Sequence, residues 1–102
     1  MMRQLLFYVI FPTFIFSEIF EQKLFDSNQA MLNKDYDKAV QLYESILDSG
    51  YLNKDLYYNL GNAYYRKNYL GQAIWAYKNA IKFYPRDEDA KYNLAVTNAR
   101  MI

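Results

Sequence analysis

The sequence repeats itself with a period of about 34 residues, and this repetition limits what the chain can fold into. The matching positions hold residues of similar size: Ala39 with Ala73, Tyr43 with Tyr77, and Leu47 with Ile81. A second shift places residues 92–95 on residues 58–61. A unit of this length cannot bury its apolar face alone and stacks on a neighbouring copy. The repetition therefore predicts a stack of similar units.

Residues 55–85 hold two helical patterns, separated by a polar break near Lys67 and Asn68. Apolar residues recur at helical intervals and mark one buried stripe on each helix. The stripes comprise Tyr57, Leu60, Gly61 and Tyr64, and then Leu70, Ala73, Ile74, Tyr77, Ala80 and Ile81. The small residues Gly61 and Ala73 allow the two helices to approach closely. The patterns predict an antiparallel helical hairpin that ends before Pro85.

The rest of the chain predicts three further helices. Residues 18–33 and 36–48 carry similar apolar spacing, and Asp35 is placed to cap the second of these helices. Gly50 is expected to end it, and Asn53 to cap the helix that follows. The acidic run that begins at Asp87 is expected to open a fifth helix over residues 87–101, because carboxylates favour the positive end of the helix dipole. The expected fold is all-α.

The second hairpin resembles a tetratricopeptide repeat (TPR). The resemblance rests on residues 59–65 together with Ala73, Ile74, Tyr77, Ala80 and Pro85, which match the L-G-x-x-Y, A-x-x-x-F and P pattern of that repeat. Tyr77 stands where the pattern has Phe. The resemblance implies a TPR superhelix over residues 18–102, with repeat one at about 20–53 and repeat two at about 54–87. Residues 88–102 would then form a half-repeat or capping helix.

Residues 1–17 differ in kind from the rest of the chain. Arg3 gives a positive start, an apolar run extends from Leu5 to Phe16, and Ser17 is a tolerated residue before a cleavage site. This layout is typical of a secretory signal peptide, and the run is shorter than the ~20 residues of a membrane-spanning helix. We expect an exported protein. An uncleaved anchor and an extra buried helix remain the alternatives.

A closer resemblance covers residues 43–94. The segments 49–51, 55–65 and 85–90 are similar to the exported TPR proteins of bacterial aerotolerance (Bat) operons. In that family the repeats follow a signal peptide, and membrane and SH3-like segments can come after them. The resemblance implies a periplasmic or cell-envelope protein, with a membrane-associated complex as one setting for it. No such later segment lies within this sequence, so the resemblance leaves membrane attachment open.

The composition argues against catalysis. The chain has no Cys and no His, so it lacks a thiolate, the common general base and the common metal ligand. No Gly-rich phosphate loop and no cluster of ligating residues is present. A net charge of +1 gives no signal for nucleic acid. We expect a protein that is not an enzyme, carries no cofactor or metal, and binds another protein or peptide.

The candidate binding surface is the face of the first helix of each repeat that lies opposite the packing stripe. Its residues are Asn28, Met31, Tyr58, Asn59, Asn62, Tyr65, Arg66, Tyr92 and Asn93. The TPR resemblance implies a groove for a peptide or helix there, and Tyr and Asn suit such contacts. Tyr58, Asn62 and Tyr65 are expected to form one ridge that binds the partner, while the opposite stripe stabilises the fold. Arg66 and Arg100 would make one end of this surface positive. The other end would be negative because of Glu21, Asp55 and Asp89.

Two alternatives bear on the partner. The asparagines Asn28 and Asn59 match those of the carboxylate clamp in TPR chaperone adaptors, but Leu24, Asp89 and Asn93 stand where its basic residues belong. Without these cations the charge-assisted bonds are lost, so we expect no binding to chaperone tails. A structural role through self-association, or a continuation of the chain beyond Ile102, is the other reading. Trp75 is expected on the convex side, partly exposed.

Overall fold

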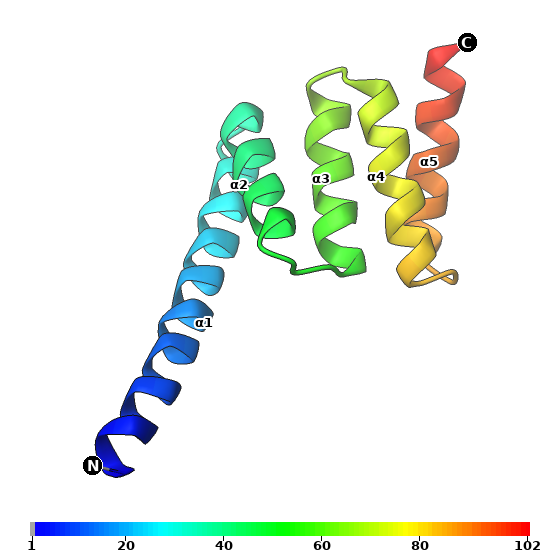
Figure 1. Ribbon diagram of the computed structural model, residues 1–102. Helices are drawn as coiled ribbons and strands as arrows, with labels where there is room; N and C mark the ends of the chain where they lie inside the picture. The colour runs from blue at the N-terminus through cyan, green and yellow to red at the C-terminus, as the bar shows by residue number, and fades with distance from the viewer. Residues whose placement is uncertain (1) are drawn as a thin grey trace.

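The protein is a stack of α-helices. The computed structural model describes residues 2–102, with side chains at Ile15 and from Ser17 onward. The helices are α1 (Met2–Leu32), α2 (Tyr36–Asp48), α3 (Lys54–Arg66), α4 (Leu70–Phe83) and α5 (Glu88–Met101). Consecutive helices run antiparallel and lie side by side (Figure 1). No strand occurs among residues 2–102, so the all-α prediction is confirmed.

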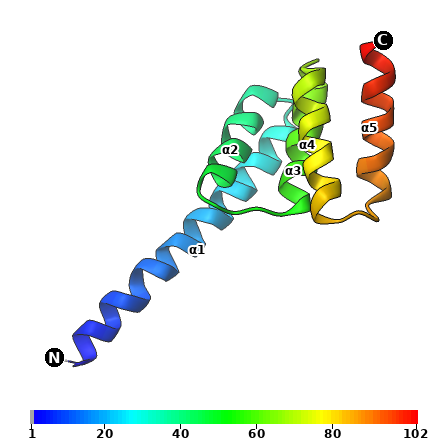
Figure 2. The same ribbon diagram turned by 45° about the vertical axis from the view of Figure 1, so that its right-hand side comes forward.

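The first helix is longer than the sequence pattern suggested. α1 begins at Met2 instead of near Glu18 and passes Ser17 without a break. Residues 13–31 contain neither Gly nor Pro, so nothing in that stretch interrupts the helix. Its N-terminal half extends away from the other helices (Figure 2). The side chains of Arg3 and of most of the apolar run lie outside the described residues. Over the part that is described, no helix is both long enough and apolar enough to cross a membrane.

Side-chain caps begin three of the helices: two are the predicted caps Asp35 and Asn53, and the third is Asp87, which was expected as the first residue of its helix. The Oδ1 of Asp35 accepts from the backbone N–H of Lys38 at 3.3 Å, and the Oδ1 of Asn53 accepts from Leu56 at 2.9 Å. The Oδ1 of Asp87 accepts from the backbone of the fifth helix at 3.1 Å. Each cap satisfies a backbone donor that the helix itself leaves unpaired.

The turns inside the two hairpins have the same geometry. Lys34 and Asn68 both adopt left-handed backbone angles, with φ of 62° and 64°. After each of these residues the backbone returns to the helix just completed. The N–H of Asp35 donates to the carbonyl of Ala30 at 2.8 Å, and the N–H of Tyr69 donates to that of Tyr64 at 2.9 Å. The period seen in the sequence is therefore also a period of backbone conformation.

A large residue packs against small ones at the centre of each hairpin. Tyr43 and Tyr77 are each 1% exposed, and Ala39 and Ala73 are fully buried. The Tyr77 ring lies directly against the backbone of Gly61, as the sequence predicted for this position. Because Gly61 lacks a Cβ, α3 and α4 approach closely enough to bury the ring.

The buried tyrosine hydroxyls are satisfied in equivalent ways in the two hairpins. The Oη of Tyr43 donates to the Oδ1 of Asn28 at 2.7 Å, and the Oη of Tyr77 donates to the Oδ1 of Asn62 at 2.6 Å. Burial raises the pKa of Tyr43 to about 12 and also raises the pKa of Tyr77 above its ordinary value. Each bond joins the two helices of one hairpin.

Candidate partner-binding groove

A cleft of about 570 Å³ opens on the side of the stack formed by α1, α3 and α5. Its walls combine aromatic rings, amides and basic groups, and α4 supplies part of the floor. The lining residues are Met31, Leu32, Lys34, Tyr36, Asn62, Tyr65, Arg66, Tyr77, Tyr92, Asn93 and Val96. We call this cleft the groove. Its volume is in the range of sites that enclose a few side chains of a ligand.

The groove gathers most of the predicted binding residues but leaves some out. Met31, Asn62, Tyr65, Arg66, Tyr92 and Asn93 line it. Tyr92 is open to solvent, with 69% of its surface exposed. Asn28, Tyr58 and Asn59 do not line it. Asn28 is occupied by its hydrogen bond to Tyr43, and Asn59 is half-buried.

The ridge of Tyr58, Asn62 and Tyr65 was predicted to contribute little to stability, and this prediction is wrong. Tyr58 and Tyr65 both pack against the hydrophobic core. The Nδ2 of Asn93 donates to the Oη of Tyr58 at 3.2 Å and to the Oδ1 of Asn62 at 3.1 Å. Asn62 also accepts the Tyr77 hydroxyl, so its side chain connects three helices. The ridge has a structural role because side chains of α5 contact it, through Asn93 at Tyr58 and Asn62 and through Arg100 at Tyr65.

Positive charge borders the end of the groove where α1, α3 and α5 finish. The Arg66 guanidinium lies 5.4 Å from the centre of the Tyr36 ring, and Arg100 lies 4.8 Å from that of Tyr65. Arg100 also donates to the Oδ1 of Asn68 at 2.8 Å. Within the described part of the chain, the groove lining includes basic side chains and no carboxylate. An anionic group on a bound segment would therefore be attracted to this end.

Several lining residues were not predicted as binding residues. Tyr36 begins the apolar spacing of residues 36–48, and Lys34 precedes the cap residue Asp35. Both reach the groove because the turn between α1 and α2 folds back at Lys34. Tyr77 contributes to the floor through its hydroxyl end, although its ring belongs to the core. The recurrence of Lys34 and Asn68 at the same repeat position was the available signal for this turn.

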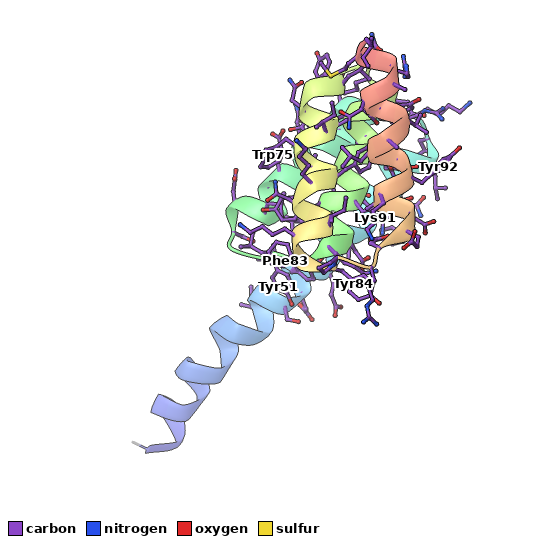
Figure 3. All side chains as sticks on the ribbon, turned by 90° about the vertical axis from the view of Figure 1, so that its right-hand side faces the viewer. Tyr51, Trp75, Phe83, Tyr84, Lys91 and Tyr92 are labelled. Carbon is purple, nitrogen blue, oxygen red and sulfur yellow. The ribbon has the colours of Figure 1, made fainter. Side chains whose placement is uncertain are left out.

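The opposite side of the stack carries the tryptophan. Trp75 is 51% exposed, as predicted, and projects away from the side on which Tyr92 lies (Figure 3). Among the described residues, no group of three or more His, Cys, Asp or Glu side chains is placed to hold a metal ion. The chemistry that the groove offers is recognition: stacking, amide hydrogen bonds and attraction of anions. A scan of family models and a search of curated proteins found no match to this sequence.

Proposed function

We propose that the chain is a TPR domain that holds a segment of a partner protein in its groove. The repeat assignment is supported by the hydrogen bonds of Asn28 with Tyr43 and of Asn62 with Tyr77, which recur with the sequence period. The left-handed turns at Lys34 and Asn68 recur in the same way. Stacks of helical hairpins commonly use the surface formed by their first helices for binding.

The observation that carries the binding proposal is the groove itself. It is a cleft rather than a flat face, and exposed Tyr92 stands beside the half-buried Tyr65 and Asn93. Rigid aromatic side chains provide contact area at low entropic cost, and amides can pair with a peptide backbone. A partner segment with an acidic residue at the Lys34 and Arg66 end fits the charge of the lining.

The setting that we propose is the cell envelope. Residues 1–17 act as an export signal, and the mature domain serves as a non-catalytic adaptor, as the resemblance to the Bat-operon TPR proteins suggests. The support is the basic start and the short apolar run of the sequence. Mass spectrometry of the protein from its native host tests this, with a mature N-terminus at Glu18 as the expected result. A full-length protein in the cytoplasm would contradict export.

Self-association is the second candidate function, and a specific feature favours it. Phe83 and Tyr84 are each 47% exposed and Tyr51 is 45% exposed, and the three lie toward the same end of the stack (Figure 3). Exposed aromatic residues that gather at one end are typical of protein contacts. This surface lies outside the groove, so one experiment can separate the two functions.

Site-specific photo-crosslinking in the native host tests the groove. A benzoylphenylalanine replaces Tyr92 in one variant and Phe83 in a matched aromatic control. We expect an adduct with another protein from position 92, and a marked loss of this adduct when Arg66→Glu is added. Lys78→Glu on α4, an equal charge change at an exposed site outside the groove, should leave the adduct unchanged.

Two outcomes would overturn the groove assignment. One is an adduct of equal yield from positions 92 and 83, which would show no preference for the groove. The other is an adduct from position 83 alone that contains a second copy of this chain, which would establish self-association instead. The crosslinked peptide also identifies the partner segment, so its charge can be compared with the positive end of the groove.

A further inference from the structure

A second cavity lies on the side of α3 that faces away from the groove. Its volume is about 350 Å³, and α2, α3, α4 and the loop before α3 all contribute to it. The residues that line it are Glu44, Leu47, Asp48, Leu52, Tyr57, Leu60, Tyr64 and Trp75. We call it the outer cavity. None of its residues lines the groove, so the two sites are separate.

Aromatic rings form the floor and one wall of the outer cavity. Tyr57 and Tyr64 are each 8% exposed and belong to the floor, whereas Trp75 stands half-exposed beside them. The Tyr57 and Trp75 rings meet edge to face, with centroids 5.7 Å apart and an interplanar angle of 78°. Tyr57 also stacks on Phe83, with ring centroids 5.7 Å apart, so the exposed part of Trp75 is the aromatic surface that a ligand can reach. Ring faces attract cations, and tryptophan does so most strongly.

Carboxylates form the opposite wall. Glu44 and Asp48 occupy successive turns of α2 and both line the cavity. The Tyr64 hydroxyl donates to the Oε1 of Glu44, which fixes that carboxylate and leaves its other oxygen to accept a further bond. This bond, after burial itself, raises the pKa of Tyr64 above its ordinary value, so the hydroxyl keeps its proton near neutral pH.

No basic residue of the described chain lines the outer cavity to neutralise these carboxylates. Lys67 is not among the lining residues, and its Nζ lies 2.6 Å from the Oδ1 of Asp37. This pairing is the main cause that raises the pKa of Lys67, and a smaller contribution comes from its attraction to Glu44. The cavity thus combines two carboxylates, with no basic side chain in the described lining, with the exposed ring of Trp75. This combination favours a cation over an anion or an apolar group.

We propose that the outer cavity binds an arginine side chain of a partner protein. A guanidinium is planar, so it can stack on Trp75 while its N–H groups donate to Glu44 and Asp48. An ammonium has no such plane, and its stronger hydration makes its transfer from water less favourable. The domain therefore has two recognition surfaces, with an arginine pocket on α2, α3 and α4 that is independent of the groove.

Trp75 is the single tryptophan of the chain, so its indole N–H signal reports on the outer cavity alone. The protein, labelled with nitrogen-15, is titrated with N-acetyl-arginine amide at low salt and followed by NMR. We expect a saturable shift of the indole signal. The neutral analogue N-acetyl-citrulline amide should cause little shift, because it keeps the shape of the side chain but not its charge. The corresponding lysine amide should bind more weakly than the arginine amide.

Variants test the carboxylates directly. Glu44→Gln with Asp48→Asn should weaken arginine binding roughly tenfold or more, since both charge-assisted contacts are lost. Glu44→Gln keeps an oxygen for the Tyr64 hydroxyl, and Asp48→Asn alone, at an exposed site, serves as a variant whose folding is not in question. Glu21→Gln with Asp26→Asn removes the same net charge from α1 and should leave the affinity unchanged.

Three results would overturn the proposal. The first is the absence of a saturable indole shift with the arginine amide. The second is an equal response to the citrulline amide or to choline, which would show that the cavity does not select a guanidinium. The third is unchanged arginine affinity in the folded Glu44→Gln, Asp48→Asn variant. An equal loss of affinity in the Glu21→Gln, Asp26→Asn control would also count, because it would show that only the net charge of the protein matters.

Discussion

Replacing Gly61 by alanine tests the packing between α3 and α4. A Cβ built on Gly61 would lie 2.6 Å from Cε1 and 2.7 Å from Cδ1 of the Tyr77 ring. Both distances are far below the separation of carbon atoms in contact. The ring is 1% exposed and its hydroxyl is bonded to Asn62. It therefore cannot move aside without disturbing the core and that bond.

Two opposing effects set the size of the change. Alanine in the middle of a helix is favoured over glycine by about 1 kcal/mol. Overpacking a well-filled core costs about 1–3 kcal/mol, and loss of the Tyr77 hydrogen bond to Asn62 adds about 1 kcal/mol. The steric effect is the larger, so we expect Gly61→Ala to lower the free energy of unfolding by about 1–3 kcal/mol.

Urea denaturation followed by far-ultraviolet circular dichroism measures this change. Gly71→Ala is the matched control, because Gly71 is also helical and has no atom within 4 Å of its Cβ position. The control should be neutral or up to about 1 kcal/mol more stable. If Gly61→Ala proves as stable as the original protein, the close approach of the Tyr77 ring does not limit the packing, and our reasoning fails. Combining it with Tyr77→Leu should recover part of the loss, which a purely local effect on α3 would not allow.

Three further predictions concern stability. Ala73→Leu should destabilise the fold by about 1–3 kcal/mol through overpacking, and Trp75→Ala should destabilise it less because half of Trp75 is exposed. Thermal melts that rank the two variants the other way would refute the helix register. Asn62→Ala should lower the free energy of unfolding, measured in urea, by about 1–3 kcal/mol, because the Tyr77 hydroxyl loses its acceptor and the Asn93 amide loses one of its two acceptors. Asn98→Ala, at an exposed site on α5, should change it little. Burial in the folded protein raises the pKa of Tyr43 from 10.0 to about 12. The contribution of Tyr43 to stability should therefore be fully present below pH 10 and should be lost as the pH rises from 10 to 12. Equal urea midpoints at pH 9 and pH 11.5 would contradict this.

The helices and their ends followed from local chemistry, except for the start of α1, which lies at Met2 and not near Glu18. Asp35 and Asn53 could be recognised as caps because a short polar side chain directly precedes a run with helical spacing. Gly61 and Ala73 were identified as contact points because small residues on an apolar stripe have few other uses. In each case the determining interaction lies within one helix or one hairpin, so the sequence order of the residues was enough.

The role of the groove residues depended on contacts between hairpins. Tyr58 has the spacing of an outward ridge on α3, and nothing within its own helix indicates that Asn93 would bond to its hydroxyl. Tyr36 has the spacing of a core residue, yet the turn at Lys34 places it at the groove. Helical periodicity separates a buried stripe from the rest of a helix. It does not tell a solvated face from one that the next helix covers.

The Tyr–Asn hydrogen bonds have a consequence for how the chain folds. Each joins residues 15 apart in the sequence, and each helix packs mainly on the helices that precede and follow it along the chain. Closing such short loops costs little chain entropy, and proteins dominated by local contacts fold in microseconds to milliseconds. Each hairpin can form its own tyrosine bond before the other hairpin is present. Folding can therefore start in either hairpin and propagate to its neighbour, as in a one-dimensional array.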